Sequence, residues 1–253
     1  MKVVSKAMKQ MYQNAGKDKM TYVVLAAPML CGLILYYGIE AAEMLLCGLL
    51  QKEEVLIPYM ELFYLLMLST PALMLSYVAI MIVLDELDEG TAKYLCVTPL
   101  GKWGYLFSRF GLAGGVSIPY TVLLGCLFPM AKISLVSIIS IVVILLIGIM
   151  FAGVGVIIAL LVTVFSGNKV EGMAIMKLSG LLLIGMAIPY FAKGVVYYVG
   201  MVLPTFWIGE FLKDVVENAA VDIGRIAVDI VSFVVFAGIW VAVCYKKFVG
   251  KLI

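Results

Sequence analysis

Long runs of hydrophobic residues, separated by short polar segments, dominate the pattern along this chain. A helix that crosses a membrane needs about 20 mostly apolar residues, within a range of about 17–25. We expect one spanning helix from each of six runs: Thr21–Ile39, Tyr59–Leu84, Tyr105–Met130, Ser134–Phe165, Met173–Phe191 and Ile226–Tyr245. The pattern therefore predicts an all-α polytopic membrane protein.

The first twenty residues have a pattern of their own, in which apolar side chains recur at three- and four-residue steps and lysines take the other positions. Such a pattern is typical of a helix that lies in the membrane surface with its lysines towards anionic lipid. A simple positively charged anchor explains the same lysines equally well. We therefore divide the chain into an N-terminal amphipathic interfacial helix, residues 1–20, and a six-helix transmembrane domain, residues 21–253.

Residues 192–221 form a second irregular region. Its apolar part, Gly194–Gly209, contains Pro204 and is followed by a short amphipathic run. Sixteen helical residues would reach only about 24 Å, less than the hydrocarbon core of about 30 Å. We expect short re-entrant helices here, which enter the membrane from the outer side and return before the last span.

Composition agrees with a membrane protein and excludes most other classes. Of the 253 residues, 64% are hydrophobic and 13% charged, and too few polar side chains remain to cover a water-exposed surface. The net charge of +2 does not favour a nucleic-acid partner. Lysines and arginines concentrate in the segments that are internal if the N-terminus is internal, so we expect both termini in the cytoplasm. The expected location is a plasma membrane of the bacterial inner-membrane type.

The residues needed for common catalytic sites are missing. The chain has no histidine, and its five cysteines are scattered with no C-x-x-C pair. No P-loop sequence is present, so the chain does not hold its own nucleotide in that way. We therefore predict no catalytic residues, no metal site and no cofactor bound by this chain.

The segment between the second and third spans carries the most information. Its acidic residues, Asp85, Glu86, Asp88 and Glu89, come where the chain leaves the membrane. Gly90 permits a sharp turn, and Thr91 can cap a short helix over Ala92–Val97. That helix must stop before Pro99, because the residue before a proline avoids the helical region. We expect a short helix on the cytoplasmic side, within a loop over 85–104, that exposes an acidic cluster.

This segment resembles the inner loop of ABC-2-type permeases, the membrane subunits of many ABC exporters, and looks most like permeases of drug exporters, including those for fluoroquinolones. In that family an acidic stretch, a Gly-Thr pair, a leucine and a Thr-Pro or Ser-Pro pair follow one another. Many members have arginine where this chain has Leu87. The matching positions here are Glu86, Asp88, Glu89, Gly90, Thr91, Leu95, Thr98, Pro99, Leu100, Tyr105 and Arg109.

The resemblance implies a function and partners. In the family the short loop helix is the coupling helix, which seats on a separate ABC ATPase that carries ATP and magnesium. A second permease, identical or related, and the lipid bilayer complete the assembly. Two other classes remain open: an intramembrane hydrolase or lipid-modifying enzyme, and a non-transporting scaffold or immunity subunit. No side-chain pattern selects the cargo.

Charged residues inside the spans mark further candidate sites, because charge within hydrocarbon is costly. Asp222, Arg225 and Asp229 lie three and four residues apart, on one face of the helix that opens the sixth span. They form either an ion-paired cluster that satisfies its own charges or an outer gate on a transport path. Glu61, near the outer end of the second span, can reach the same layer.

Overall fold

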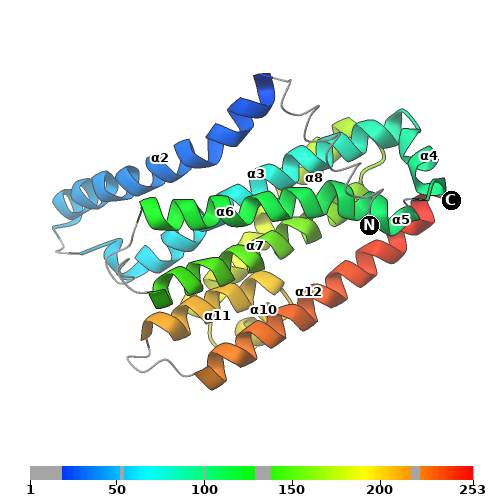
Figure 1. The fold of residues 1–253 in the computed structure, drawn as a ribbon. Coiled ribbons are helices and arrows are strands. Elements are labelled where there is room, and N and C mark those ends of the chain that lie inside the picture. Colours follow the sequence, from blue (N-terminus) through cyan, green and yellow to red (C-terminus); the bar gives the residue numbers. More distant parts are fainter. Residues whose placement is uncertain (1–18, 52–53, 100, 129–137, 218–222, 253) are drawn as a thin grey trace.

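The computed structural model describes residues 19–51, 54–99, 101–128, 138–217 and 223–252, and all regular structure in these ranges is helical (Figure 1). This confirms the predicted all-α class. Nearly all of the proposed N-terminal amphipathic helix, and the candidate residue Asp222, lie outside the described residues.

Six helical segments in the described residues are long and apolar enough to cross a membrane, as predicted. Three of them are single helices, and three combine helical elements. The single helices are α2 (Lys19–Leu50), α7 (Ile138–Phe165) and α12 (Ile223–Leu252). The second segment consists of the 3-10 turn η1 (Ile57–Tyr59) followed by α3 (Met60–Asp88). The third segment joins α5 (Gly101–Leu106), a π-helical turn η2 (Phe107–Gly111) and α6 (Leu112–Leu127). The fifth joins α8 (Lys169–Ser179), a 3-10 stretch η3 (Gly180–Ala187) and α9 (Ile188–Phe191).

Helices α3, α6 and α7 pack against one another and form the centre of the bundle. Their facing side chains include Leu68, Leu124 and Ile147, all of which are buried. Small residues permit this close packing: a side-chain atom added at Gly155 of α7 would collide with Ser76 and the backbone of Ala72 in α3. Close approach of this kind is how helices associate where lipid offers no hydrophobic driving force.

Helix α2 lies at the edge of the bundle and packs mainly on α3 (Figure 1). Its outward side chains, among them Ile34, Met44 and Leu49, are exposed, as expected for a helix that faces lipid. Its end is fixed by Glu43, whose carboxylate accepts hydrogen bonds from the backbone N–H groups of Val55 (2.8 Å) and Leu56 (2.6 Å). These bonds position the 3-10 turn η1 (Ile57–Tyr59), which leads into α3.

The described part of the region at 192–221 forms two short helices, α10 (Val195–Gly200) and α11 (Pro204–Glu217), joined by a turn. Gly194, with φ of 68°, starts α10, and Pro204 begins α11 instead of interrupting a longer helix. Two short helices therefore replace a seventh crossing, as the length of the apolar run requires. Helix α11 packs against α12, η3 and α9.

The two ends of the bundle carry different polar groups. A short helix, α4 (Thr91–Val97), lies at one end, together with the C-terminal end of α12 (Figure 1). The end of α11 and the start of α12 lie at the opposite end. We refer to these as the α4 end and the α11–α12 end.

Candidate functional site

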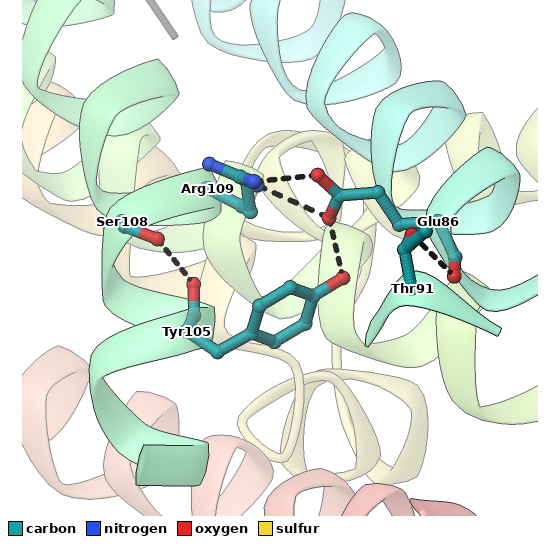
Figure 2. Close-up of polar contacts among 5 residues, drawn as sticks. All are labelled: Glu86, Thr91, Tyr105, Ser108 and Arg109. Atoms are coloured by element: carbon teal, nitrogen blue, oxygen red, sulfur yellow. Dashed lines mark hydrogen bonds and ion pairs between the residues drawn. The ribbon is translucent and has the colours of Figure 1, made fainter. Parts of the chain in front are cut away.

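Helix α4 begins directly after a sharp turn at Gly90, whose φ of 76° lies in the left-handed region. The turn is as predicted, but the capping role expected of Thr91 is wrong. The Thr91 hydroxyl does not accept a hydrogen bond from α4; it donates one to the backbone carbonyl of Glu86, at 3.1 Å (Figure 2). The last turn of α3 leaves such carbonyls without helical partners, so Thr91 closes α3 instead of opening α4. At the other end, extended Thr98 terminates α4 before Pro99, as expected.

Glu86 is the centre of a polar network that joins α3 to the next segment (Figure 2). Its carboxylate accepts two hydrogen bonds from the Arg109 guanidinium, from Nε at 3.1 Å and from a terminal nitrogen at 2.5 Å. The Tyr105 hydroxyl donates to the same carboxylate at 2.7 Å. Both charged side chains are mostly buried, and bidentate arginine–carboxylate pairs are strong and geometrically specific. The network therefore holds the end of α3 firmly to α5 and η2.

A second set of contacts joins the same end of α3 to α8. The Lys169 ammonium pairs with Asp85 at 2.6 Å, and the Lys169 backbone N–H donates to Asp88 at 3.1 Å. Asn168 caps α8 by accepting from the Glu171 backbone N–H at 2.9 Å. Sequence reasoning missed Lys169 because it is 84 residues away from Asp85.

We expected all four acidic residues to be exposed, but only two of them are. Asp85 and Glu86 make the internal contacts described above, Asp88 is exposed but accepts the bond from Lys169, and Glu89 is exposed. Of the other candidate residues, Gly90, Thr91 and Leu95 are partly buried and support the turn, and Thr98 and Pro99 are exposed. The acidic motif therefore acts chiefly through hydrogen bonds and ion pairs that fix the end of α3 and so position α4.

The outward face of α4 is apolar and aromatic. Ala92 is fully buried under the helix, whereas Tyr94 and Val97 are 76% and 84% exposed. Lys93 beside them is also exposed. Nearby, Trp103 is 60% exposed and stacks on Tyr245 of α12. We call Lys93, Tyr94 and Val97 the α4 face; a rigidly supported apolar surface of this kind suits a protein partner.

At the α11–α12 end, two of the predicted residues, Arg225 and Asp229, interact, and two residues of α11 join them. Asp229 is buried, Arg225 is exposed, and the charges that act on Asp229 come from Asp214, Glu210 and Arg225. Glu61, buried in the first turn of α3, is not among the groups that act on Asp229 in the described residues.

Glu210 and Asp214 were not predicted as site residues. They lie four residues apart on amphipathic α11, which is the signal that they share one face. Glu210 accepts a hydrogen bond from the Tyr197 hydroxyl at 2.6 Å. Burial and this hydrogen bond raise the pKa of Tyr197 well above its ordinary range, so its hydroxyl remains a donor. Within the described ranges, no group of acidic, cysteine or histidine side chains has the arrangement of a metal site.

Comparison with known proteins gives one family. The family model described as "Fluoroquinolones export permease protein Rv2686c-like" matches residues 11–245 of the 253. A search of curated proteins finds no match.

Proposed function

The chain belongs to the Rv2686c-like family of fluoroquinolone export permeases, and from this premise we propose that it is the membrane subunit of an ABC-type exporter driven through α4. A separate ABC ATPase, which carries ATP and magnesium, would bind the α4 face. A second permease, identical or related, would complete the path for the cargo. In this arrangement α4 and both chain termini lie in the cytoplasm. The family membership itself assigns an export permease, a transport subunit rather than an enzyme.

The observation that carries the proposal is an exposed apolar face on a short helix that packs against α3 and α5. Burying the side chains of Tyr94 and Val97 against a partner would remove apolar surface from water, which is favourable by about 25 cal/mol per Å². Helix α4 supplies the contact, and the chain contains no P-loop that would let it hydrolyse ATP by itself.

The ion pairs at the end of α3 explain how a push on α4 would reach the spans. Glu86 links the end of α3 to Arg109 before α6, and Asp85 links it to Lys169 at the start of α8. A displacement of α4 by the ATPase would therefore move three membrane segments together. Coupling between distant sites needs a contiguous rigid network of this kind, or an element with two arrangements that both sites bias.

Capture of the ATPase by the purified permease tests this role. We expect Tyr94→Ala combined with Val97→Ser to reduce co-purification of the ATPase by about tenfold, since truncating buried anchors commonly costs 1.4 kcal/mol or more. The matched control is Tyr198→Ala with Val195→Ser, two equally exposed side chains on α10. Equal capture by both double variants would refute the proposed role of α4.

A further inference from the structure

The α11–α12 end holds more negative than positive charge. Glu210 and Asp214 of α11 face Asp229 of α12 closely enough for their charges to interact, and Arg225 is the cation that acts on the same carboxyl group. Lys213, the neighbour of Asp214, donates its hydrogen bond to the carbonyl of Pro189 instead, at 3.1 Å. Two carboxylates and one guanidinium of the described residues therefore act on the buried carboxyl group of Asp229. We call Glu210, Asp214, Arg225 and Asp229 the outer acidic cluster.

Asp229 is the unusual member of this cluster. It is only 6% exposed, and its Oδ2 atom has no hydrogen-bond partner among the described residues. A buried polar atom in a native protein is normally hydrogen-bonded, and leaving one unpaired is expensive. At the α4 end, by contrast, the partly buried carboxylate of Glu86 accepts three hydrogen bonds. The unpaired oxygen of Asp229 indicates that the cluster is completed by something else.

An aromatic pair lies along the same two helices as the cluster. Trp207 lies one turn before Glu210 on α11 and stacks on Phe236 of α12, with ring centroids 5.8 Å apart. The indole N–H groups of Trp207 and Trp240 donate to the carbonyls of Met201 and Val202. Their hydrogen-bonding groups are therefore occupied, and their remaining contribution to a ligand is an aromatic surface. Aromatic faces near carboxylates favour an organic cation, which gains both cation–π and ionic attraction.

We propose that the outer acidic cluster, with Trp207 beside it, binds the protonated or quaternary amine of a small aromatic molecule. A bare metal ion fits less well, because the described carboxylates are not arranged as a metal site. The ammonium would interact with Asp229 and Glu210, and the aromatic part would lie against Trp207. Only the identification of this cation as cargo rests on the proposed function; binding itself does not require the ATPase.

Binding of N-benzylpyridinium to the purified full-length chain in lipid nanodiscs tests this site. A Trp103→Phe background removes the one tryptophan at the α4 end, so quenching by the pyridinium reports on Trp207 and Trp240. We expect saturable quenching that uncharged diphenylmethane, which has nearly the same shape, does not compete away. Asp229→Asn should weaken binding by about tenfold or more, since removing one partner of a buried charge pair has effects of that size. Glu54→Gln, an exposed carboxylate outside the cluster, should leave binding unchanged.

The outcomes separate this site from the role of α4. Unaltered affinity in Asp229→Asn, or an equal loss in Glu54→Gln, would overturn the proposal. If Asp229→Asn fails to fold, Glu210→Gln and Asp214→Asn apply the same test, and unchanged affinity in both would overturn it. Tyr94→Ala should keep the quenching while losing the ATPase, so a failure of either proposal is visible without the other.

Discussion

The two ends of this membrane bundle use carboxylates in opposite ways. At the α4 end, Glu86 and Asp85 are paired with Arg109 and Lys169, and their bonds connect α3 to its neighbours. At the α11–α12 end, the charges of Glu210, Asp214 and Arg225 act on Asp229, and one oxygen of Asp229 has no partner in the described residues. Satisfied charges make a rigid support, whereas unsatisfied buried charge is retained where a ligand can pair with it. We therefore propose that the first end transmits motion and that the second binds a ligand.

The largest loss of folding stability should come from breaking the hydrogen-bond network of Glu86. Arg109→Ala leaves a mostly buried carboxylate without its cation, and we expect a loss of about 2–3 kcal/mol in the free energy of unfolding, because breaking buried pairs is strongly destabilising. Thermal unfolding in detergent measures this. Glu86→Ala combined with Arg109→Ala should be less destabilised than Arg109→Ala alone. Arg225→Ala at the other end, where the side chain is exposed, should cost less than about 1 kcal/mol.

The two turns with positive φ allow a comparison of stability with coupling. Gly90 and Gly194 start α4 and α10, with φ of 76° and 68°, and nothing lies within 4 Å of an added side-chain atom at either. Gly90 is in the left-handed region, so alanine there should cost about 1–2 kcal/mol through backbone strain. Gly194 has ψ of −134°, which side chains avoid more strongly, so Gly194→Ala should destabilise the chain more. Only Gly90→Ala should also lower the ATP hydrolysis that accompanies export. Equal loss of coupled hydrolysis in both variants would contradict a special role for the α4 end.

Removing charge from the outer acidic cluster should stabilise the protein, whereas the substitutions above destabilise it. Asp229→Asn eliminates a buried charge that lacks a full set of partners, so we expect a gain of about 1 kcal/mol in unfolding free energy without ligand. Chemical denaturation of the purified chain checks it. A clear loss of stability would show that Asp229 is already fully paired, and the contrast between the two ends would disappear.

The smallest loss of folding stability is expected when the Asp85–Lys169 ion pair is removed. Both side chains are nearly half exposed, so Asp85→Asn should cost about 0.5 kcal/mol or less. The difference from the parent protein should shrink further as salt is raised, because salt screens exposed pairs. Melting temperatures at low and high salt measure this. A large, salt-insensitive loss would mean that this second anchor of α3 is as strong as the Glu86 network.

Local features of the sequence were sufficient for the architecture. Runs of apolar residues defined the six membrane-length helices, and Gly90 and Pro99 marked the bounds of α4, because turn and proline geometry are short-range effects. The too-short apolar run before the last span correctly predicted α10 and α11.

The polar networks could not be read in the same way. Arg109 is 23 residues from Glu86, Lys169 is 84 from Asp85, and Asp229 meets residues of another helix. Such pairs depend on how helices pack, which periodicity does not specify. Thr91 was misjudged because one hydroxyl can either accept from the helix it precedes or donate to the helix before it. Both arrangements satisfy a helix end, and only the structure distinguishes them.

If a separate ATPase engages α4, site-directed disulfide or bifunctional cross-linking in native membranes should detect the contact. In a chain whose five cysteines are replaced, single cysteines would be placed at Tyr94 or Val97 of α4 and at Tyr198 or Val195 of α10. We predict that the α4 cysteines cross-link to the ATPase and resist membrane-impermeant labels applied from outside. The α10 cysteines should form no cross-link to the ATPase and should react with those labels. Cysteines on α4 that are labelled from outside and form no cross-link would contradict the account.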